Sequence, residues 1–186
     1  MFLRNRIIVA TVDEINLRGF KFTMSDLTKR LSISKSSLYE HFSSKDELIA
    51  TILDMVLNDF KSQEETIYHS NLPVIEKLKA ILTINPKTFE PFHNRVYDDL
   101  RLTYPDEWRK VSNFRKERMD RLTSLLQQGI DAGTIRPVNI SVVRQMIIST
   151  TNDLISYRFL AENNLTYQNA VSAMLDVLIQ GLIVKE

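Results

Sequence analysis

Hydroxyl, imidazole and ammonium side chains are concentrated in a short segment near the N-terminus, at residues 34–41. The segment reads Ser-Lys-Ser-Ser-Leu-Tyr-Glu-His, and Lys45 follows four residues later. Such groups donate hydrogen bonds to phosphate oxygens and to the edges of bases, and small hydroxyls allow a close approach. The residue types in this segment therefore suit the binding of nucleic acid.

Two short helices must hold this segment in place. Thr23-Met24-Ser25-Asp26 resembles a capping box, which predicts a helix over residues 23–31. Ser34 is a suitable cap for a second short helix over residues 35–42. About three residues then separate the two helices, which is typical of a helix-turn-helix.

The second helix is expected to present its polar residues outward, because its apolar residues Leu38 and Phe42 lie four apart and face inward. In a helix-turn-helix this second helix enters the major groove of DNA. Residues 1–50 carry eight Lys and Arg against six Asp and Glu, a small basic excess in the same direction. The pattern predicts double-stranded operator DNA as a partner.

The stretch Ile7 to Ile52 resembles the DNA-binding domain of the TetR family of repressors (TetR/AcrR type). The strongest match is Phe-Thr-Met-Ser-Asp-Leu-Thr-Lys-Arg-Leu-Ser-Ile-Ser-Lys-Ser-Ser-Leu-Tyr-Glu-His-Phe-Ser-Ser-Lys-Asp-Glu-Leu at residues 22–48. It contains the Thr that opens the second helix, the Leu-Tyr-x-x-Phe of the recognition helix, and the Lys followed by acids and Leu. The resemblance implies a regulator that binds DNA as a dimer.

By this resemblance, phosphates would be contacted by Thr23, Tyr39 and Lys45, and the residues nearest to bases would be Lys35, Ser36, Ser37 and His41. We include Ser34, the cap of the recognition helix, in the same DNA-binding set. Structural roles remain open for some of them. Tyr39 could pack on the next helix, Thr23 could be only a cap, Lys45 could be solvated, and an exposed His41 could be inert.

Two positions depart from the family pattern. Thr28 stands where a smaller residue is usual, and Ser32 stands where the turn has a glycine. A glycine in such a turn often adopts a positive φ, which serine reaches only at some cost. We expect an altered or less stable turn but the same fold.

The whole chain is expected to be all-α. Helical periodicity and caps predict about nine helices, near residues 3–18, 23–31, 35–42, 45–68, 73–83, 86–103, 106–132, 140–161 and 166–183. We divide the chain into a helix-turn-helix domain, residues 1–47, and a larger helical domain for ligand binding and dimerisation, residues 48–186. The second domain is assigned from periodicity, since the resemblance there is weak.

The last two helices are apolar on more than one face. We predict dimerisation through Ile147, Leu154, Val171, Leu175, Leu178 and Leu182. A second stripe, Ala170, Met174, Val177 and Gly181, runs beside the first, and two stripes suggest burial against both the body and a partner. A homodimer would then form a four-helix bundle. The alternative is an unusually apolar core helix in a monomer.

Aromatic residues are dense in the middle of the chain. We predict a small-molecule effector site lined by Phe89, Phe92, Tyr97, Arg101, Tyr104, Trp108 and Phe114. Apolar walls with a few polar groups are typical of such sites, although helical domains also use aromatics as core. Arg101 could pair with a ligand carboxylate or, alternatively, with Asp98 on its own helix.

Several function classes are disfavoured. The chain has no cysteine, and it lacks the Gly-rich phosphate loops, the GxSxG elbow and the HExxH zinc motif. We therefore expect no enzyme activity, no cofactor and no metal site. The N-terminus does not read as a signal peptide and no long apolar run occurs, so we expect a cytoplasmic protein without a membrane partner.

The resulting prediction is a ligand-responsive transcriptional regulator, a repressor that a small molecule releases from its operator. Two alternatives stay open. One is an architectural DNA-binding dimer that senses nothing. The other is a helical binding protein that does not read DNA.

Overall fold

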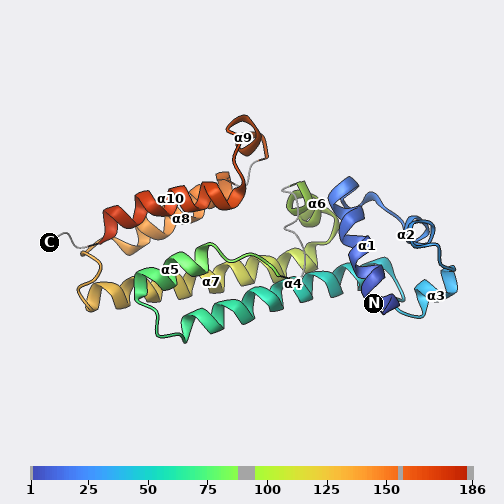
Figure 1. Cartoon of the computed structure of the whole chain (residues 1–186), viewed down its shortest axis with the longest axis horizontal. Coiled ribbons are helices and arrows are strands. Elements are labelled where there is room, and N and C mark those ends of the chain that lie inside the picture. The colour runs from blue at the N-terminus through green and yellow to red at the C-terminus, as the bar shows by residue number, and fades with distance from the viewer. Residues whose placement is uncertain (1, 88–94, 155–156, 184–186) are drawn as a thin grey trace. The chain divides into compact units, whose positions relative to one another are not determined.

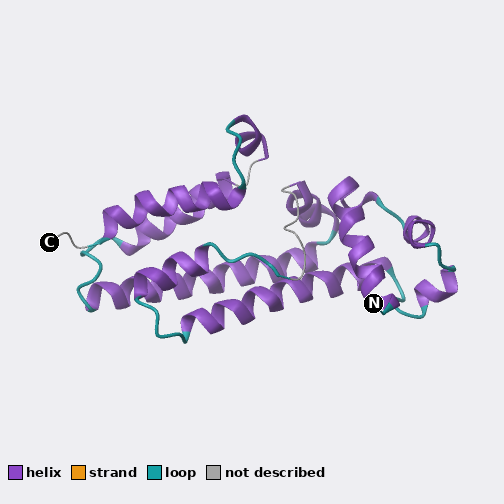
Figure 2. Cartoon of the chain, in the orientation of Figure 1, coloured by secondary structure: helices purple, strands orange, loops and turns teal. Residues whose placement is uncertain are grey.

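Helices account for almost all of the regular structure in the computed structural model, which describes residues 2–87, 95–154 and 157–183 (Figures 1 and 2). Within these ranges there are ten α-helices, one 3-10 helix and no strand. The elements are α1 (Leu3–Arg18), η1 (Gly19–Lys21), α2 (Met24–Leu31), α3 (Lys35–Tyr39), α4 (Lys45–Tyr68), α5 (Val74–Leu82), α6 (Arg95–Thr103), α7 (Pro105–Asp131), α8 (Ile140–Leu154), α9 (Tyr157–Glu162) and α10 (Tyr167–Leu182). The all-α prediction is confirmed.

Most predicted helices are present close to their expected bounds, but three differ. Of the helix expected over residues 86–103, the structure shows α6 from Arg95 to Thr103; residues 86 and 87 are not helical, and residues 88–94 lie outside the described residues. The helix expected over residues 140–161 is divided into α8, which ends at Leu154, and α9, which begins at Tyr157. The recognition helix α3 ends at Tyr39, earlier than the predicted Phe42. Residues 40–42 continue as a turn in which the amides of His41 and Phe42 donate to the Leu38 carbonyl.

The helices form two compact units. Unit 1 comprises Met1–Phe60 and Asn85–Val111, and unit 2 comprises Lys61–Ile84 and Ser112–Glu186. The boundary predicted between residues 47 and 48 lies inside α4. Unit 1 also includes α6, which the sequence analysis assigned to the C-terminal domain.

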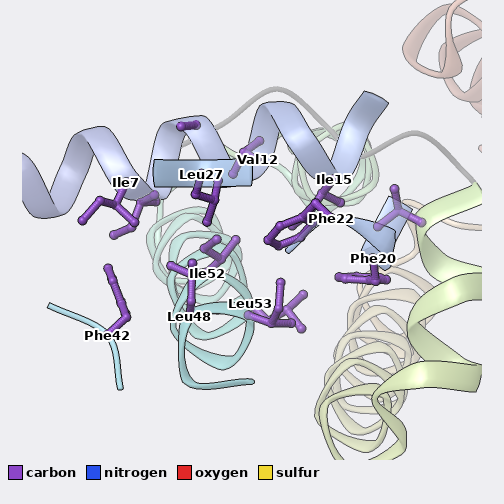
Figure 3. Close-up of a cluster of buried hydrophobic side chains, with 14 of the residues drawn as sticks. Ile7, Val12, Ile15, Phe20, Phe22, Leu27, Phe42, Leu48, Ile52 and Leu53 are labelled. Carbon is purple, nitrogen blue, oxygen red and sulfur yellow. The ribbon is translucent and has the colours of Figure 1, made fainter. Parts of the chain in front are cut away.

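The core of unit 1 joins α1, α2 and the first half of α4 (Figure 3). Its largest fully buried side chains include Phe22, Phe42, Ile7 and Leu27. Leu38 of α3 is completely buried in the same cluster. Leu38, in the middle of the recognition segment Ser34–Phe42, and Phe42, at its end, anchor the segment in the core, and Ser34, Lys35, Ser36, Tyr39 and Glu40 are exposed.

An ion-pair cluster reinforces the packing of α2 on α1. Glu14 is 3% exposed and receives Arg30 at 3.1 Å and Arg18 at 2.7 Å, while Arg30 also reaches Asp13 at 2.6 Å. A buried carboxylate is tolerated when cations compensate its charge. The cluster therefore fixes the orientation of α2 relative to α1.

Unit 2 has its own core, built from α5, α7, α8 and α10. Its part of α4 is joined to α7 by ion pairs, including Glu64 with Arg118 at 2.9 Å and Lys61 with Glu117 at 3.8 Å. Glu64 is 2% exposed, and burial raises its pKa above the ordinary value. Arg118 also donates to the Ile81 carbonyl, so one side chain links three segments of the unit.

Candidate nucleic-acid interface

Thr23 begins α2 through a complete capping box. Its Oγ1 accepts from the Asp26 amide at 3.2 Å, and the Asp26 carboxylate accepts from the Thr23 amide at 2.8 Å and from its hydroxyl at 2.7 Å. These hydrogen bonds from Thr23 hold the pKa of Asp26 below its ordinary value. The cap predicted from sequence is confirmed. The hydroxyl of Thr23 stays exposed, and its contact with a phosphate stays a prediction.

The turn after α2 adopts the left-handed conformation for which the family pattern has a glycine. Ser32 adopts φ 55° and ψ 45°, in the left-handed region. Its amide donates to the Lys29 carbonyl, and the Ile33 amide donates to the Thr28 carbonyl. The serine thus closes α2 in the way a glycine would, with the backbone strain that a Cβ brings.

Ser34 and Ser37 form the first turn of α3. The Ser37 amide donates to Ser34 Oγ at 3.0 Å, and the two hydroxyl oxygens lie 2.9 Å apart. Ser34 is exposed and Ser37 is partly buried. Both hydroxyls are therefore already engaged with each other, and a base contact by Ser37 would have to share that hydrogen bond.

The outer surface of α3 is polar and accessible. Lys35 and Ser36 are exposed, Tyr39 is 48% exposed, and His41 in the following turn is partly buried. About half of the surface of Tyr39 is therefore accessible, and both its phosphate contact and its packing on the next helix stay open. The structure brings these predicted base- and phosphate-contacting residues together on one short segment, and their contact with DNA stays a prediction.

Lys45 has a structural role that the sequence analysis missed. Its ammonium donates to the carbonyls of Phe20 at 2.5 Å and Phe22 at 2.7 Å, and lies 4.4 Å from the centre of the Phe22 ring. Burial lowers the pKa of Lys45. The side chain therefore fixes the first turn of α4 to the loop before α2, and is not an ordinary solvated lysine.

The helix α6 and the start of α7 pack against the same loop. A Cβ built on Gly19, whose φ is 64°, would collide with the carboxylate of Asp99. Tyr104 stacks edge-on against Phe20 with ring centres 5.1 Å apart. Burial, together with the charge and hydrogen bond of Asp46, raises the pKa of Tyr104. Residues far apart in sequence thus support the start of α4.

The residues predicted to line an effector site are divided between the two units. Tyr104 and Trp108 are partly buried against the core of unit 1, Arg101 is exposed, and Phe114 is buried in unit 2. Phe89, Phe92 and the side chain of Tyr97 lie outside the described residues. The effector site stays a prediction.

The residues predicted to form the dimer interface are mostly core within a single chain. Ile147, Val171, Leu175 and Leu182 are 1–4% exposed, while Leu154 and Leu178 are partly buried. Full burial leaves a side chain no surface to offer a partner. The exposed apolar residues of these helices are Val142 and Met146 on α8 and Val177 on α10, at 53%, 52% and 77% exposure.

Among the described residues, no group of three or more His, Asp or Glu is arranged to hold a metal ion. None of the described helices combines the length and apolar character that crossing a membrane requires.

Comparison with known proteins agrees with this architecture. Residues 7–52 match the sequence model of the bacterial regulatory proteins of the tetR family. The chain is 29% identical over 182 residues to the uncharacterized HTH-type transcriptional regulator YvaF of Bacillus subtilis strain 168, covering 97% of this chain and 96% of YvaF.

Solved structures share the fold across almost the whole length. The ketosteroid transcriptional regulator KstR2 of Mycobacterium tuberculosis superposes with a TM-score of 0.76 at 22% identity, covering 98% of this chain and 95% of KstR2. AibR in complex with isovaleryl coenzyme A and operator DNA superposes with a TM-score of 0.64 at 20% identity, covering 94% and 97%. Residues 7–52 thus match the tetR family of bacterial regulatory proteins, and the chain shares the fold of these solved regulators over almost its whole length.

Proposed function

We propose that this protein is a ligand-responsive transcriptional regulator that binds operator DNA as a homodimer and is released by a small-molecule effector. The observation that carries the proposal is the recognition segment. Leu38 and Phe42 are buried, and Lys35, Ser36 and Tyr39 of the same short segment stand exposed, within the residues that match the tetR family. Operator binding implies the cytoplasm as the working compartment.

The recognition segment divides its work between bases and phosphates. We assign base contacts to Lys35, Ser36 and His41, because the first two are exposed on α3 and His41 is partly buried in the following turn. We assign phosphate contacts to the exposed hydroxyls of Thr23 and Tyr39. Lys45 acts mainly by fixing the start of α4 beneath this segment. Ser34 acts as the cap, which orients the first turn of α3.

Dimerisation is supported by the apolar residues that α8 and α10 leave exposed. Val142 and Met146 lie four residues apart on one face of α8. On α10, Val177 and Gly181 continue one stripe, and nothing lies within 4 Å of a Cβ built on Gly181. We assign the interface to this exposed face, which can pack against the same face of a second copy. Two recognition helices then read grooves roughly 34 Å apart.

The test of DNA binding is selection of bound fragments from the source genome, followed by titration of the recovered site at several salt concentrations. We expect a site with two related half-sites one helical turn apart, and an affinity that falls steeply with salt. Recovery of no common sequence, with salt-insensitive binding, would exclude operator recognition.

The test of effector response uses the recovered operator with added ligands. AibR, which shares the fold, was solved with isovaleryl coenzyme A, so short-chain acyl-CoA thioesters are the first probes. We expect one class of compound to weaken operator binding, because a ligand shifts the equilibrium only when it prefers the conformation that does not bind DNA. A broad panel without effect would favour a DNA-binding dimer that senses nothing.

A further inference from the structure

Arg4, which lies outside the helix-turn-helix, is placed beside the end of the recognition segment. It stands in the first turn of α1, and its guanidinium carbon lies 5.0 Å from the centre of the Phe42 ring. Phe42 directly follows His41 in the chain. The arginine is exposed, so its charged group faces solvent while one side rests on an aromatic platform.

Arg4 has no acidic partner in the first turn of its own helix, and the one acid whose pKa it lowers is already hydrogen-bonded to another residue. The first turn of α1 has no acidic residue, and a cation at the N-terminal end of a helix opposes the helix dipole. Glu47 is the acid whose pKa Arg4 helps to lower, after the hydrogen bonds from Ser43. That carboxylate already accepts from the Ser43 amide at 2.7 Å and from its hydroxyl at 2.6 Å. The arginine therefore has a capacity for hydrogen bonds that an external anion could use.

We propose that Arg4 binds a phosphate of the DNA backbone at the edge of the site read by α3, which extends the interface beyond the residues of the helix-turn-helix. The inference rests on the proposed DNA binding. A guanidinium presents paired N–H donors that match phosphate oxygens. Stacking on Phe42 restrains the side chain before DNA arrives, so less conformational freedom is lost on binding.

A phosphate contact fits the geometry better than a base contact. Arg4 borders the recognition segment from a different helix and sits beyond His41, where the DNA backbone flanks the groove that α3 enters. Phosphate contacts carry no sequence information but fix the orientation of the protein on the duplex. Arg4 therefore contributes to affinity and orientation rather than to the choice of operator sequence.

The experiment measures how operator affinity changes with salt for the full-length protein and three variants. Arg4→Met removes the charge but keeps an apolar stem on Phe42, and Arg4→Lys keeps the charge. Arg6→Met is the matched control, because Arg6 is an exposed arginine two residues further on, around the other side of α1. Thermal unfolding of each variant checks that the fold is intact.

We expect Arg4→Met to reduce the slope of log affinity against log salt by about 1.8, because each homodimer loses two phosphate contacts worth about 0.9 each. Between about 50 and 200 mM salt this corresponds to about a 12-fold change in the ratio of wild-type to variant affinity. Arg4→Lys should restore most of the slope, and a randomised-site selection should return the wild-type sequence for all variants.

Three outcomes would overturn the inference. An unchanged slope in Arg4→Met would show that Arg4 does not touch a phosphate, and an equal loss in Arg6→Met would show that only total charge matters. An altered sequence preference would indicate a base contact. Failure of the wild-type protein to bind any DNA is a different result, because it would reject the proposed function itself.

Discussion

At the residue scale, the family pattern assigns Lys45 to a contact with DNA, and the structure adds a second role. The same side chain attaches the first turn of α4 to the loop between α1 and α2. Its ammonium reaches the carbonyls of Phe20 and Phe22, 25 and 23 residues earlier in the chain. These carbonyls end η1 and precede α2, so the loop between α1 and α2 depends on a residue of α4. Loss of Lys45 should therefore reduce stability as well as DNA binding.

We predict that Lys45→Met destabilises the protein by about 1–2 kcal/mol, because two partly buried carbonyls lose a charged donor. Lys35→Met is the matched control, since Lys35 is exposed on α3, and it should change stability by no more than about 0.5 kcal/mol. Urea unfolding of both variants measures the difference. If Lys45→Met had the same free energy of unfolding as Lys35→Met, water would replace the hydrogen bonds of Lys45 at no cost.

Ser32 allows a second test at this scale. The left-handed conformation costs a non-glycine residue about 1–2 kcal/mol, and glycine regains part of that cost while adding freedom to the unfolded chain. We predict that Ser32→Gly stabilises the protein by about 0.5 kcal/mol. Gly133 has φ 70° with open space around it, so Gly133→Ala should have the opposite sign for the same reason. Thermal unfolding measures the direction of the stability change in both variants. A Ser32→Gly protein that is less stable than wild type would contradict the backbone strain argued for Ser32.

The turn at Ser32 is an example of a local feature that the sequence predicts correctly. Its conformation and the caps by Thr23 and Ser34 follow from hydrogen bonds between near neighbours, which a sequence encodes directly. The attachment of Lys45 to Phe20 and Phe22, and of Arg4 to Phe42, depends on helices meeting in space. Neither contact has a local pattern, so neither was predicted.

At the scale of elements, hydrophobic periodicity predicted where helices lie better than what they touch. The bounds of α1 and α4 agree with the prediction, since Gly19 follows the end of α1 and Ser44 caps the start of α4. The two apolar stripes on α10 predicted two buried faces. A stripe alone does not indicate whether a face is buried within the same chain or against a second copy. The structure resolves this by burying Val171, Leu175 and Leu182 and leaving Val177 exposed.

The aromatic cluster illustrates the same limit of the pattern. Tyr104 and Trp108 were predicted to line a ligand site, and they pack against the core of unit 1. Aromatic side chains have a similar spacing in the sequence whether they form core or pocket walls. Which of the two they form depends on how the helices pack, here α6 against η1, where Gly19 makes room for Asp99. Such packing between distant segments cannot be read from the spacing.

The capping box of α2 gives a prediction of pH dependence. Hydrogen bonds from Thr23 lower the pKa of Asp26 in the folded protein below 3.8, its ordinary value. A carboxyl with a lowered folded pKa contributes stability at pH values above its unfolded pKa, and that contribution is lost as the pH falls through the folded pKa. We predict that Asp26→Asn is less stable than wild type near neutral pH and that the gap narrows towards about pH 3. Urea unfolding at several pH values tests this, and a constant gap would show that ionisation of Asp26 does not matter.

At the scale of the whole molecule, the proposed regulator needs two copies, and each copy must keep a folded unit 2 while presenting an apolar face. The core of that unit already uses the inner stripe of α10, and α8 packs beside it. Val142, Met146 and Val177 lie outside that core and are exposed in the single chain. Burial of such residues against a second copy would remove apolar surface from water, the main driving force of association.

Two substitutions on α10 separate dimerisation from folding. Val177 is 77% exposed, so Val177→Glu should leave unit 2 folded but place a charge in the interface, and we predict monomers in sedimentation at concentrations where the wild type is dimeric. Val171 is 1% exposed, so Val171→Glu buries a charge within one chain and should unfold the unit instead. Operator binding should weaken with Val177→Glu because the two recognition segments are no longer coupled. A Val177→Glu protein that remains dimeric would place the interface on another face and leave the exposed stripe without a partner.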